Sequence, residues 1–335
     1  MRLFMPAEVY IDPRCNRYEE TERIKALFRL EGIPIKETRK VEISGSIPEK
    51  YSRSKKTIYL TVNKQKKLRP CKPSADYQFS LSSSCPGNCE YCYLQTTQGE
   101  TPFMKLFVNI QEILGVLDDY IEKGKPNITS FESGSITDPV ALEHLTGNLK
   151  SCIEYFAEND YGLLRVITKY DNVDSFTSIK HNKHTKFRFS INSRYVINNF
   201  EHGTTSFEER ILASKKIAKA GYPLGFIIAP IMIYDGWKEE YKELLDKLYE
   251  EIKDYNDEIT FELIQHRYTL AAKELITKRF PGTKLHMKEE ERKQKWGPYG
   301  KFKFVYPKER SEEIKEYLTS LISERFLNGR IEYFT

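Results

Sequence analysis

The feature that most constrains the fold is an alternation of short β-rich segments with helical patterns between residues 75 and 264. Short runs rich in β-branched and aromatic side chains predict strands, and apolar residues that recur every three or four positions predict helices. Parallel neighbours need a crossover between them, so six such units predict a parallel sheet with right-handed crossovers. The predicted strands are Tyr77–Ser82, Ile128–Phe131, Leu164–Thr168, Lys186–Ile191, Leu224–Ala229 and Ile259–Ile264.

Helices are predicted between these strands, and six units are too few to close an eight-stranded barrel. We therefore expect an α/β fold built as a partial (β/α)6 barrel of the TIM type, open on one side, after an N-terminal region of mixed structure. That region contains an amphipathic stretch at 20–30 and a strand at 57–62. The predicted barrel helices are Val108–Glu122, Leu142–Glu158, Val173–Lys180, Phe207–Ala220 and Lys238–Asp254.

Polar or carbonyl groups follow the predicted strands at their carboxyl ends. In barrel enzymes these ends form the rim that carries the active site. We therefore expect the following residues near one rim: Thr137, Asp138, Lys169, Ser190, Asn192, Ala229, Pro230, Gln265, His266 and Arg267.

Three of the six cysteines fall in one short segment after the first predicted strand, with the spacing Cys85-x3-Cys89-x2-Cys92. Three thiolates can hold a four-iron cluster and leave one iron free for an external ligand. A structural zinc site would need a fourth ligand, and neither a fourth clustered cysteine nor a paired histidine is nearby, so zinc is disfavoured. Cys15, Cys71 and Cys152 stand alone, and a lone cysteine is most often a small buried apolar residue.

Positive charge is concentrated in two segments that lack acids, although Lys and Arg exceed Asp and Glu by only 53 to 48. Residues 51–72 hold eight basic residues and residues 292–308 hold six. The second segment also contains Trp296, Tyr299, Phe302, Phe304 and Tyr306. Either segment alone could be a solvated face, but the pair favours binding of a polyanion with bases that stack.

The composition excludes a disordered chain, since 39% of residues are hydrophobic and 13% aromatic. No apolar run approaches the roughly 20 residues of a spanning helix, and the first residues lack a signal peptide. We therefore expect a cytoplasmic protein that does not bind membranes.

The cysteine motif at the end of the first barrel strand resembles that of the radical S-adenosylmethionine superfamily. Over nearly its whole length the chain resembles the spore photoproduct lyase family within it. The matching segments are KPSADYQ at 72–78, CPGNCEYCYLQT at 85–96, EHLTGNLK at 143–150, RFSINSRYVINNFE at 188–201, FELIQHRYT at 261–269 and KWGPYG at 295–300.

The resemblance implies a DNA repair lyase that reverts spore photoproduct, 5-thyminyl-5,6-dihydrothymine, to two thymines by 5′-deoxyadenosyl radical chemistry. Its implied cofactors are a [4Fe-4S] cluster and S-adenosylmethionine. Its implied partners are double-stranded DNA that contains the lesion and a one-electron donor such as a flavodoxin or ferredoxin, in the interior of a bacterial cell or spore. We expect a monomer. The implied regions are 1–74 (N-terminal α/β region), 75–285 (partial barrel) and 286–335 (DNA-binding hairpin and helix).

The resemblance also assigns roles to individual residues. Cys85, Cys89 and Cys92 match the cluster ligands. Tyr91 and Tyr93 match tyrosines thought to return a radical toward the cofactor, although either could instead pack under the cluster. The positions implied to contact S-adenosylmethionine are Tyr93, Thr137, Lys169, Ser190, Asn192 and Ala229. The implied DNA contacts are Lys295, Trp296, Tyr299, Lys301 and Lys303.

Two positions depart from the best-known branch of the family. Ser135 stands where that branch has the cysteine that gives its hydrogen to the product radical, and a serine O–H is too strong to do so. Cys71 is therefore the expected donor, as in a second branch with a cysteine before the first barrel strand. Pro298 replaces an arginine that faces DNA. Ser135 leaves two alternatives open: an impaired homologue, or a radical enzyme acting on another nucleic-acid base. A rival from another class is a DNA-binding module whose three-cysteine cluster is only structural.

Overall fold

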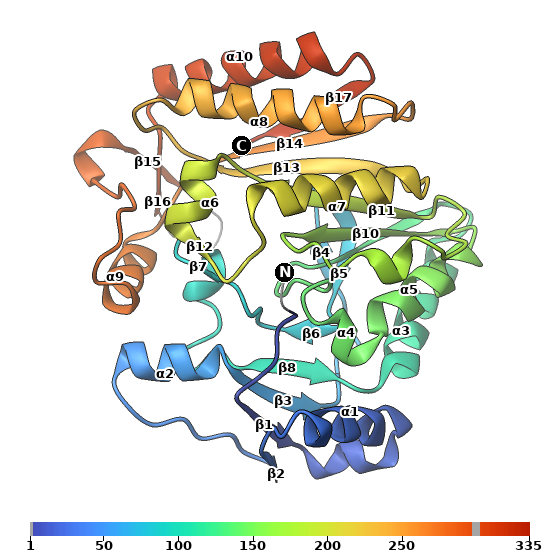
Figure 1. The fold of residues 1–335 in the computed structure, drawn as a ribbon. Helices are drawn as coiled ribbons and strands as arrows, with labels where there is room; N and C mark the ends of the chain where they lie inside the picture. The colour runs from blue at the N-terminus through green and yellow to red at the C-terminus, as the bar shows by residue number, and fades with distance from the viewer. Residues whose placement is uncertain (1–2, 297–301) are drawn as a thin grey trace.

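A curled eight-stranded sheet dominates the computed structural model, which describes residues 3–296 and 302–335 (Figure 1). Its strand order is β17-β14-β13-β11-β10-β9-β5-β4, and every neighbouring pair is parallel except β4 with β5. The strands are β4 (Arg69–Cys71), β5 (Ala75–Phe79), β9 (Thr129–Ser133), β10 (Gly162–Thr168), β11 (Thr185–Ile191), β13 (Leu224–Ile231), β14 (Ile259–Gln265) and β17 (Gly329–Phe334).

All six predicted barrel strands are present, which confirms the partial barrel. The edge strands β4 and β17 were not predicted, because each is short or follows a helix without a clear alternating pattern. No helix among the described residues is long and apolar enough to cross a membrane.

Helices cover the outer face of this sheet, as Figure 1 shows. Their apolar residues recur at helical spacing and are buried, for example Ile113, Leu117 and Ile121 on α3. The helices along the barrel are α3 (Ile110–Gly124), α4 (Glu143–Thr146), α5 (Asn148–Ala157), α6 (Arg194–Phe200), α7 (Phe207–Lys219), α8 (Trp237–Ile252) and α10 (Lys308–Arg325).

Two predicted helices differ from the structure, and one observed helix along the barrel was not predicted. The predicted helix 142–158 is two helices, because Gly147 at φ +72° ends α4 and begins α5. The predicted helix 173–180 is only a 3₁₀ turn, η3 (Asp174–Phe176). Helix α6 was not predicted, since its seven residues are too few to show a period.

The inner and outer faces of the barrel strands differ in polarity. Along β11, Phe187, Phe189 and Ile191 belong to the apolar core, while Arg188 and Ser190 alternate with them and contact polar groups of other strands. The apolar side chains pack under the helices, so the polar side chains are left to the barrel interior.

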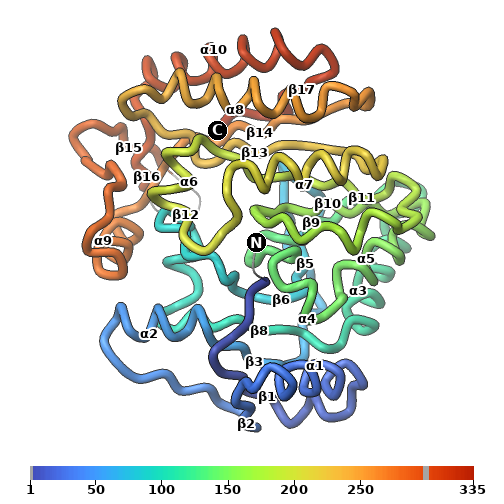
Figure 2. The backbone as a smooth tube through the Cα atoms, in the orientation of Figure 1, coloured from blue at the N-terminus to red at the C-terminus, as the bar shows by residue number. Residues whose placement is uncertain are grey.

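A second sheet has the strand order β2-β1-β3-β8-β6 (Figure 2). Its strands are β1 (Glu8–Ile11), β2 (Ile35–Glu37), β3 (Thr57–Thr61), β6 (Ser82–Ser83) and β8 (Met104–Phe107), with helices α1 (Glu19–Leu30) and α2 (Ile47–Ser54) and the 3₁₀ turn η1 (Pro13–Arg17). Strands β6 and β8 of this sheet follow residue 74 in sequence, while β4 of the eight-stranded sheet precedes it. The expected division at residues 74 and 285 stays a prediction.

The C-terminal part contains a hairpin beside the barrel rim. Strands β15 (Lys293–Trp296) and β16 (Phe302–Val305) pair antiparallel, and Phe304 stacks on Tyr268 with ring centroids 5.3 Å apart. The neighbouring elements are α9 (Leu270–Arg279) and the 3₁₀ turn η4 (Glu289–Glu291).

Candidate active site at the cysteine loop

The three clustered cysteines lie in a loop between the two sheets. Strand β7 (Asn88–Cys89) pairs with β12 (Glu201–His202), and the 3₁₀ turn η2 (Tyr93–Gln95) follows Cys92. Cys85, Cys89 and Cys92 line one open cavity of about 790 Å³. Predicted residues that line the same cavity are Tyr93, Thr137, Asp138, Lys169 and Ser190. The sequence motif and the rim residues therefore meet at one place.

The donor set of this cavity fits an iron–sulfur cluster. Among the described residues, no three His, Cys, Asp or Glu side chains lie close enough together to bind one metal ion. A four-iron cluster does not require that, because each of its cysteines binds a different iron. Burial raises the pKa of Cys85 to about 11 and also raises the pKa of Cys92, while the nearby Lys55 and Lys169 act in the opposite direction on Cys92. These two cations would stabilise thiolates in the loop.

The loop also needs a glycine between two of its cysteines. A Cβ at Gly87 would lie 3.0 Å from Thr204 Cγ2 and 3.1 Å from the hydroxyl of Tyr170. Lys55, which follows helix α2, holds the start of the loop by donating a hydrogen bond of 2.5 Å to the carbonyl of Cys85. The chain around the cysteines is therefore held closely on both sides.

Lys169 follows β10 and faces the cavity with its ammonium group. Its Nζ donates to Ser190 Oγ at 2.6 Å and lies 3.4 Å from Glu201 Oε1. Glu201 is fully buried and also pairs with Arg210 at 2.6 Å. Although burial opposes it, Arg210 and Lys169 hold the pKa of Glu201 below its ordinary value. Lys169 is thus a positioned cation beside an ionised carboxylate.

Tyr91 and Tyr93 lie in different surroundings although only Cys92 separates them. Tyr91 donates a hydrogen bond to Glu201, and the Nζ of Lys169 lies 5.7 Å from its ring centroid. Tyr93 lines the cavity, is 62% exposed and donates to the carbonyl of Ser135. Of the two phenols, Tyr93 is therefore the one open to a bound substrate.

Cys71 and Ser135 meet beside the cavity. The sulfur of Cys71, at the end of β4, lies 3.7 Å from Ser135 Oγ. Both side chains donate to the same oxygen of Glu132, Cys71 from 3.4 Å and Ser135 from 2.7 Å. Ser135 lines the cavity. A thiol at residue 71 and a hydroxyl at residue 135 therefore reach the same corner of the site.

Two of the residues expected to contact S-adenosylmethionine do not line this cavity. Asn192 is fully buried, with Oδ1 accepting from Tyr241 at 2.9 Å and Nδ2 donating to the Pro230 carbonyl at 2.8 Å. Ala229 lies near the end of β13, whose last residues fix Asn192. Asn192 therefore acts here in packing the rim.

Three of the residues expected to contact DNA lie on the described strands of the hairpin. Lys295 and Trp296 are exposed on β15, and Lys303 lies opposite Lys295 on β16. Trp296 contacts Phe302 edge to face at 4.6 Å, and both rings remain largely exposed. Tyr299 and Lys301, like Pro298, lie outside the described residues.

The sequence analysis did not predict a role for Glu132 or Glu201 beside the cavity. It placed Arg267 at the rim but did not predict its position beside the hairpin. Glu132 lies one residue beyond the predicted strand 128–131, and an acid there interrupts an otherwise ordinary strand end. Glu201 closes the segment RFSINSRYVINNFE. Burial together with the charges of Arg267 and Lys295 lowers the pKa of Lys303, so these three cations lie close together.

A profile of the family "Spore photoproduct lyase" matches residues 4–335. The chain is 45% identical to the spore photoproduct lyase of Bacillus subtilis (strain 168) over 99% of both chains. It is 42% identical to that of Geobacillus sp. (strain Y412MC61) over 100% of both.

Solved structures agree with these relatives. The fold matches a spore photoproduct lyase complexed with dinucleoside spore photoproduct, with a TM-score of 0.95, 41% identity and full coverage of both chains. It matches equally well a double mutant of such an enzyme that holds S-adenosylmethionine and dinucleoside spore photoproduct, in which a cysteine is changed to alanine and a serine to cysteine.

The mutated positions in those structures have the same spacing as three residues of this site. The substituted serine and cysteine of the double mutant are 64 residues apart, as are Cys71 and Ser135, with the residue types exchanged. A further mutant changes a tyrosine to phenylalanine 42 residues before that cysteine, the separation of Tyr93 from Ser135.

Proposed function

This chain belongs to the spore photoproduct lyase family, and from that premise we propose that it repairs DNA by reverting spore photoproduct to two thymines. The observation that carries the proposal is the meeting of Cys85, Cys89 and Cys92 with Lys169 and Ser190 around one cavity. A DNA-binding module with a purely structural cluster would not need an open cavity lined by positioned polar groups.

Cys85, Cys89 and Cys92 would hold a [4Fe-4S] cluster, and the remaining cavity would hold S-adenosylmethionine. Bound together, these groups supply a 5′-deoxyadenosyl radical that removes a hydrogen from the lesion. Lys169 offers a point charge to a carboxylate of the bound cofactor, and the hydroxyls of Ser190 and Thr137 offer hydrogen bonds. The protein's own task is orientation and the exclusion of competing quenchers.

Cys71 donates the hydrogen that completes repair. Once the bond between the two bases has broken, one thymine is left as a carbon radical that must gain a hydrogen atom. A thiol S–H is weak enough to give it and a serine O–H is not. The 3.7 Å between Cys71 Sγ and Ser135 Oγ supports this assignment, because Ser135 lines the cavity. The exchanged spacing in the related double mutant supports it as well.

Tyr93 returns the hydrogen to Cys71. Donation leaves a thiyl radical on the sulfur, and transfer of a hydrogen atom from the Tyr93 phenol restores the thiol and leaves a tyrosyl radical. The hydrogen bond from Tyr93 to the Ser135 carbonyl supports the step, since Ser135 also contacts Cys71. Tyr91, whose phenol is hydrogen-bonded to Glu201, then gives its hydrogen atom to the Tyr93 oxygen. The hydrogen that the cofactor took from the lesion would in turn restore Tyr91.

The hairpin β15–β16 contacts the damaged duplex. Lys295 and Lys303, joined by Arg267, bind phosphates, and Trp296 with Phe302 fills the space of bases that leave the stack. On the family resemblance alone, we propose Tyr299 and Lys301 as further DNA contacts. A flavodoxin or ferredoxin delivers the electron to a monomer in the cytoplasm of the cell or spore, where the DNA lies.

The test is an anaerobic assay of the reconstituted protein on an oligonucleotide that contains spore photoproduct, with thymine followed by chromatography. We expect conversion of the lesion to two thymines that depends on S-adenosylmethionine and reductant. Cleavage of S-adenosylmethionine without any conversion of the lesion would instead favour another nucleic-acid substrate.

A further inference from the structure

Glu132 is a buried carboxylate that touches both side chains able to sit at the donor position. It lies on β9, is 4% exposed, and its Oε1 accepts from Cys71 at 3.4 Å and from Ser135 at 2.7 Å. Its Oε2 accepts from Ser74 and from Arg188. One oxygen therefore faces the cavity corner and the other faces the barrel interior.

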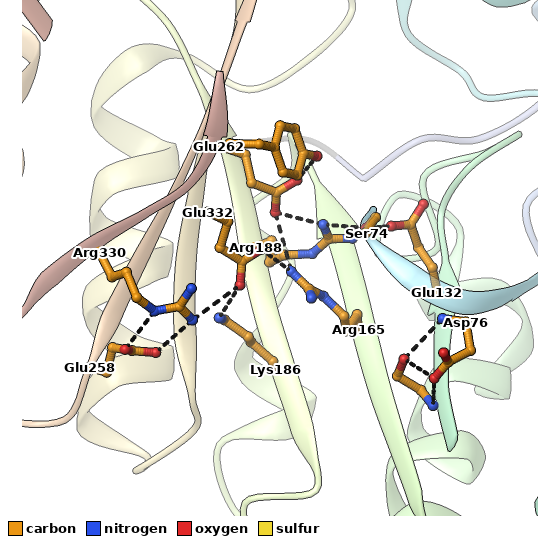
Figure 3. Close-up of polar contacts among 12 residues, drawn as sticks. Ser74, Asp76, Glu132, Arg165, Lys186, Arg188, Glu258, Glu262, Arg330 and Glu332 are labelled. Atoms are coloured by element: carbon orange, nitrogen blue, oxygen red, sulfur yellow. Dashed lines mark hydrogen bonds and ion pairs between the residues drawn. The ribbon is translucent and has the colours of Figure 1, made fainter. Parts of the chain in front are cut away.

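The barrel interior fixes Glu132 from behind, as Figure 3 shows. Arg188 is fully buried, donates to Ser74 at 2.7 Å and pairs with Glu262 at 2.6 Å. Glu262 in turn lies 3.5 Å from Arg165, which pairs with Glu332 at 2.6 Å. Each charge in this row has an opposite neighbour, so Glu132 has little freedom to turn away from Cys71.

Glu132 is ionised in this environment. Burial alone would raise its pKa, but Arg188 and the hydroxyls of Ser135 and Ser74 together hold the pKa below its ordinary value. The sulfur of Cys71 therefore faces a negative charge. On that side the thiol is favoured over the thiolate, because a second negative charge would repel the first.

We propose that Glu132 is a positioning residue that keeps Cys71 in its hydrogen-bearing thiol form and fixes the direction of its S–H bond. This inference rests on the proposed role of Cys71 as hydrogen donor. A thiolate has no hydrogen atom to give, so a donor that ionised would leave the substrate radical to other quenchers. The hydrogen bond to Glu132 keeps the hydrogen on the Cys71 sulfur until the substrate radical approaches.

The other charged and titratable groups around Cys71 agree with this role. Burial is the largest influence and raises the pKa of Cys71 to about 11, with Glu132 acting in the same direction. Arg188 acts in the opposite direction but is shared between Glu132 and Glu262. Tyr93, on the cavity side, is a phenol that donates its hydrogen bond to the carbonyl of Ser135.

The shared oxygen also explains why a cysteine could serve at either residue. Ser135 and Cys71 both donate to Glu132 Oε1, so the carboxylate would hold a thiol at residue 135 as it holds one at residue 71. If the cysteine is moved from residue 71 to residue 135, the hydrogen donation should therefore still depend on Glu132.

The first test measures the Cys71 thiol without any turnover. Alkylation of Cys71 by iodoacetamide is followed by mass spectrometry across pH 7 to 11 in the folded protein. Glu132→Gln, which keeps the shape and removes the charge, should move the midpoint of the alkylation profile down by about one pH unit or more. Ser135→Ala is the matched control, because it removes a hydrogen bond to Glu132 and keeps the charge, so its midpoint should not fall.

A second variant guards against a folding defect. Glu132→Asp retains the charge beside Arg188 but withdraws it from the sulfur, and it should move the midpoint in the same direction by a smaller amount. An unchanged midpoint in whichever of the two folds would overturn the role of Glu132.

The second test follows products during repair. In Glu132→Gln the share of consumed lesion that ends as thymine should fall as pH rises from 7 to 10, and it should fall further than the wild-type share over the same range. The double variant Cys71→Ser/Ser135→Cys should acquire the same pH dependence when Glu132→Gln is added. A pH-independent share in both Gln variants would overturn the proposal. Clean repair by Cys71→Ala would instead remove the donor assignment itself, so the two failures are distinguishable.

Discussion

At the scale of single residues, the chemistry depends on which side chain beside Glu132 carries a hydrogen that a carbon radical can take. Cys71 and Ser135 both touch that carboxylate, but only the thiol bond is weak enough. We therefore predict that Cys71→Ala leaves S-adenosylmethionine cleavage and consumption of the lesion intact while thymine changes from the major to a minor product, replaced by adducts with the reductant. Ser135→Ala should leave thymine the major product. Chromatography of the products with mass spectrometry of the adducts checks both, and the reverse pattern would make Cys71 a packing residue.

At the scale of elements, the hairpin β15–β16 is held to the barrel at one end and presents cations and rings at the other. Phe304 docks it through backbone hydrogen bonds with Tyr268, whereas Lys295 and Lys303 lie across from each other on the two strands. We predict that the charge reversals Lys295→Glu and Lys303→Glu weaken duplex binding and flatten its dependence on salt, by about 0.9 in the log-log slope for each phosphate that the variant no longer binds. Lys36→Glu, on the edge strand β2 of the other sheet, changes the net charge equally and should leave the slope unaltered. Binding titrations at several salt concentrations measure this, and equal flattening in the control would place the DNA elsewhere.

At the scale of the whole molecule, a row of buried charges joins five strands across the interior of the open barrel. Arg188 is its centre, with Glu132 and Glu262 on either side, and Arg330 at its outer end pairs with Glu258 near solvent. We predict that Arg188→Met lowers the free energy of unfolding at pH 7 by about 3–5 kcal/mol, because it leaves buried Glu132 without a cation and Glu262 with only Arg165 at 3.5 Å. Arg188 is the main group that lowers the pKa of Glu132, so this pKa rises in the variant, and the destabilisation should shrink as pH falls toward 5 and Glu132 protonates. Arg330→Met should cost within about 1 kcal/mol, since that pair is exposed. Denaturant unfolding at pH 7 and pH 5 measures the free energy of unfolding of the two variants. Equal destabilisation in both would mean that the buried charges stabilise the fold no more than the exposed pair does.

The sequence alone determined the barrel units and the cluster loop, because both are local patterns. A strand such as Lys186–Ile191 is visible from a few consecutive side chains, and the spacing of Cys85, Cys89 and Cys92 is set within eight residues. The break of a predicted helix at Gly147, the short helix α6 and the edge strands β4 and β17 carry too few residues for a period to show. Their existence depends on the neighbours against which they pack.

Only the tertiary structure decided how the separate segments combine into a site. Strands β6 and β8 follow the start of the barrel in sequence but complete the N-terminal sheet, since the chain passes from β5 to β6 within residues 80–81 and the cluster loop then joins β6 to β8 of that sheet. Glu201 reaches Tyr91 across 110 residues, and Glu132 reaches Cys71 across 61. No local pattern encodes such pairs. A buried carboxylate requires a cation and donors from other strands to be stable, and which strands supply them is fixed only when the sheet has curled.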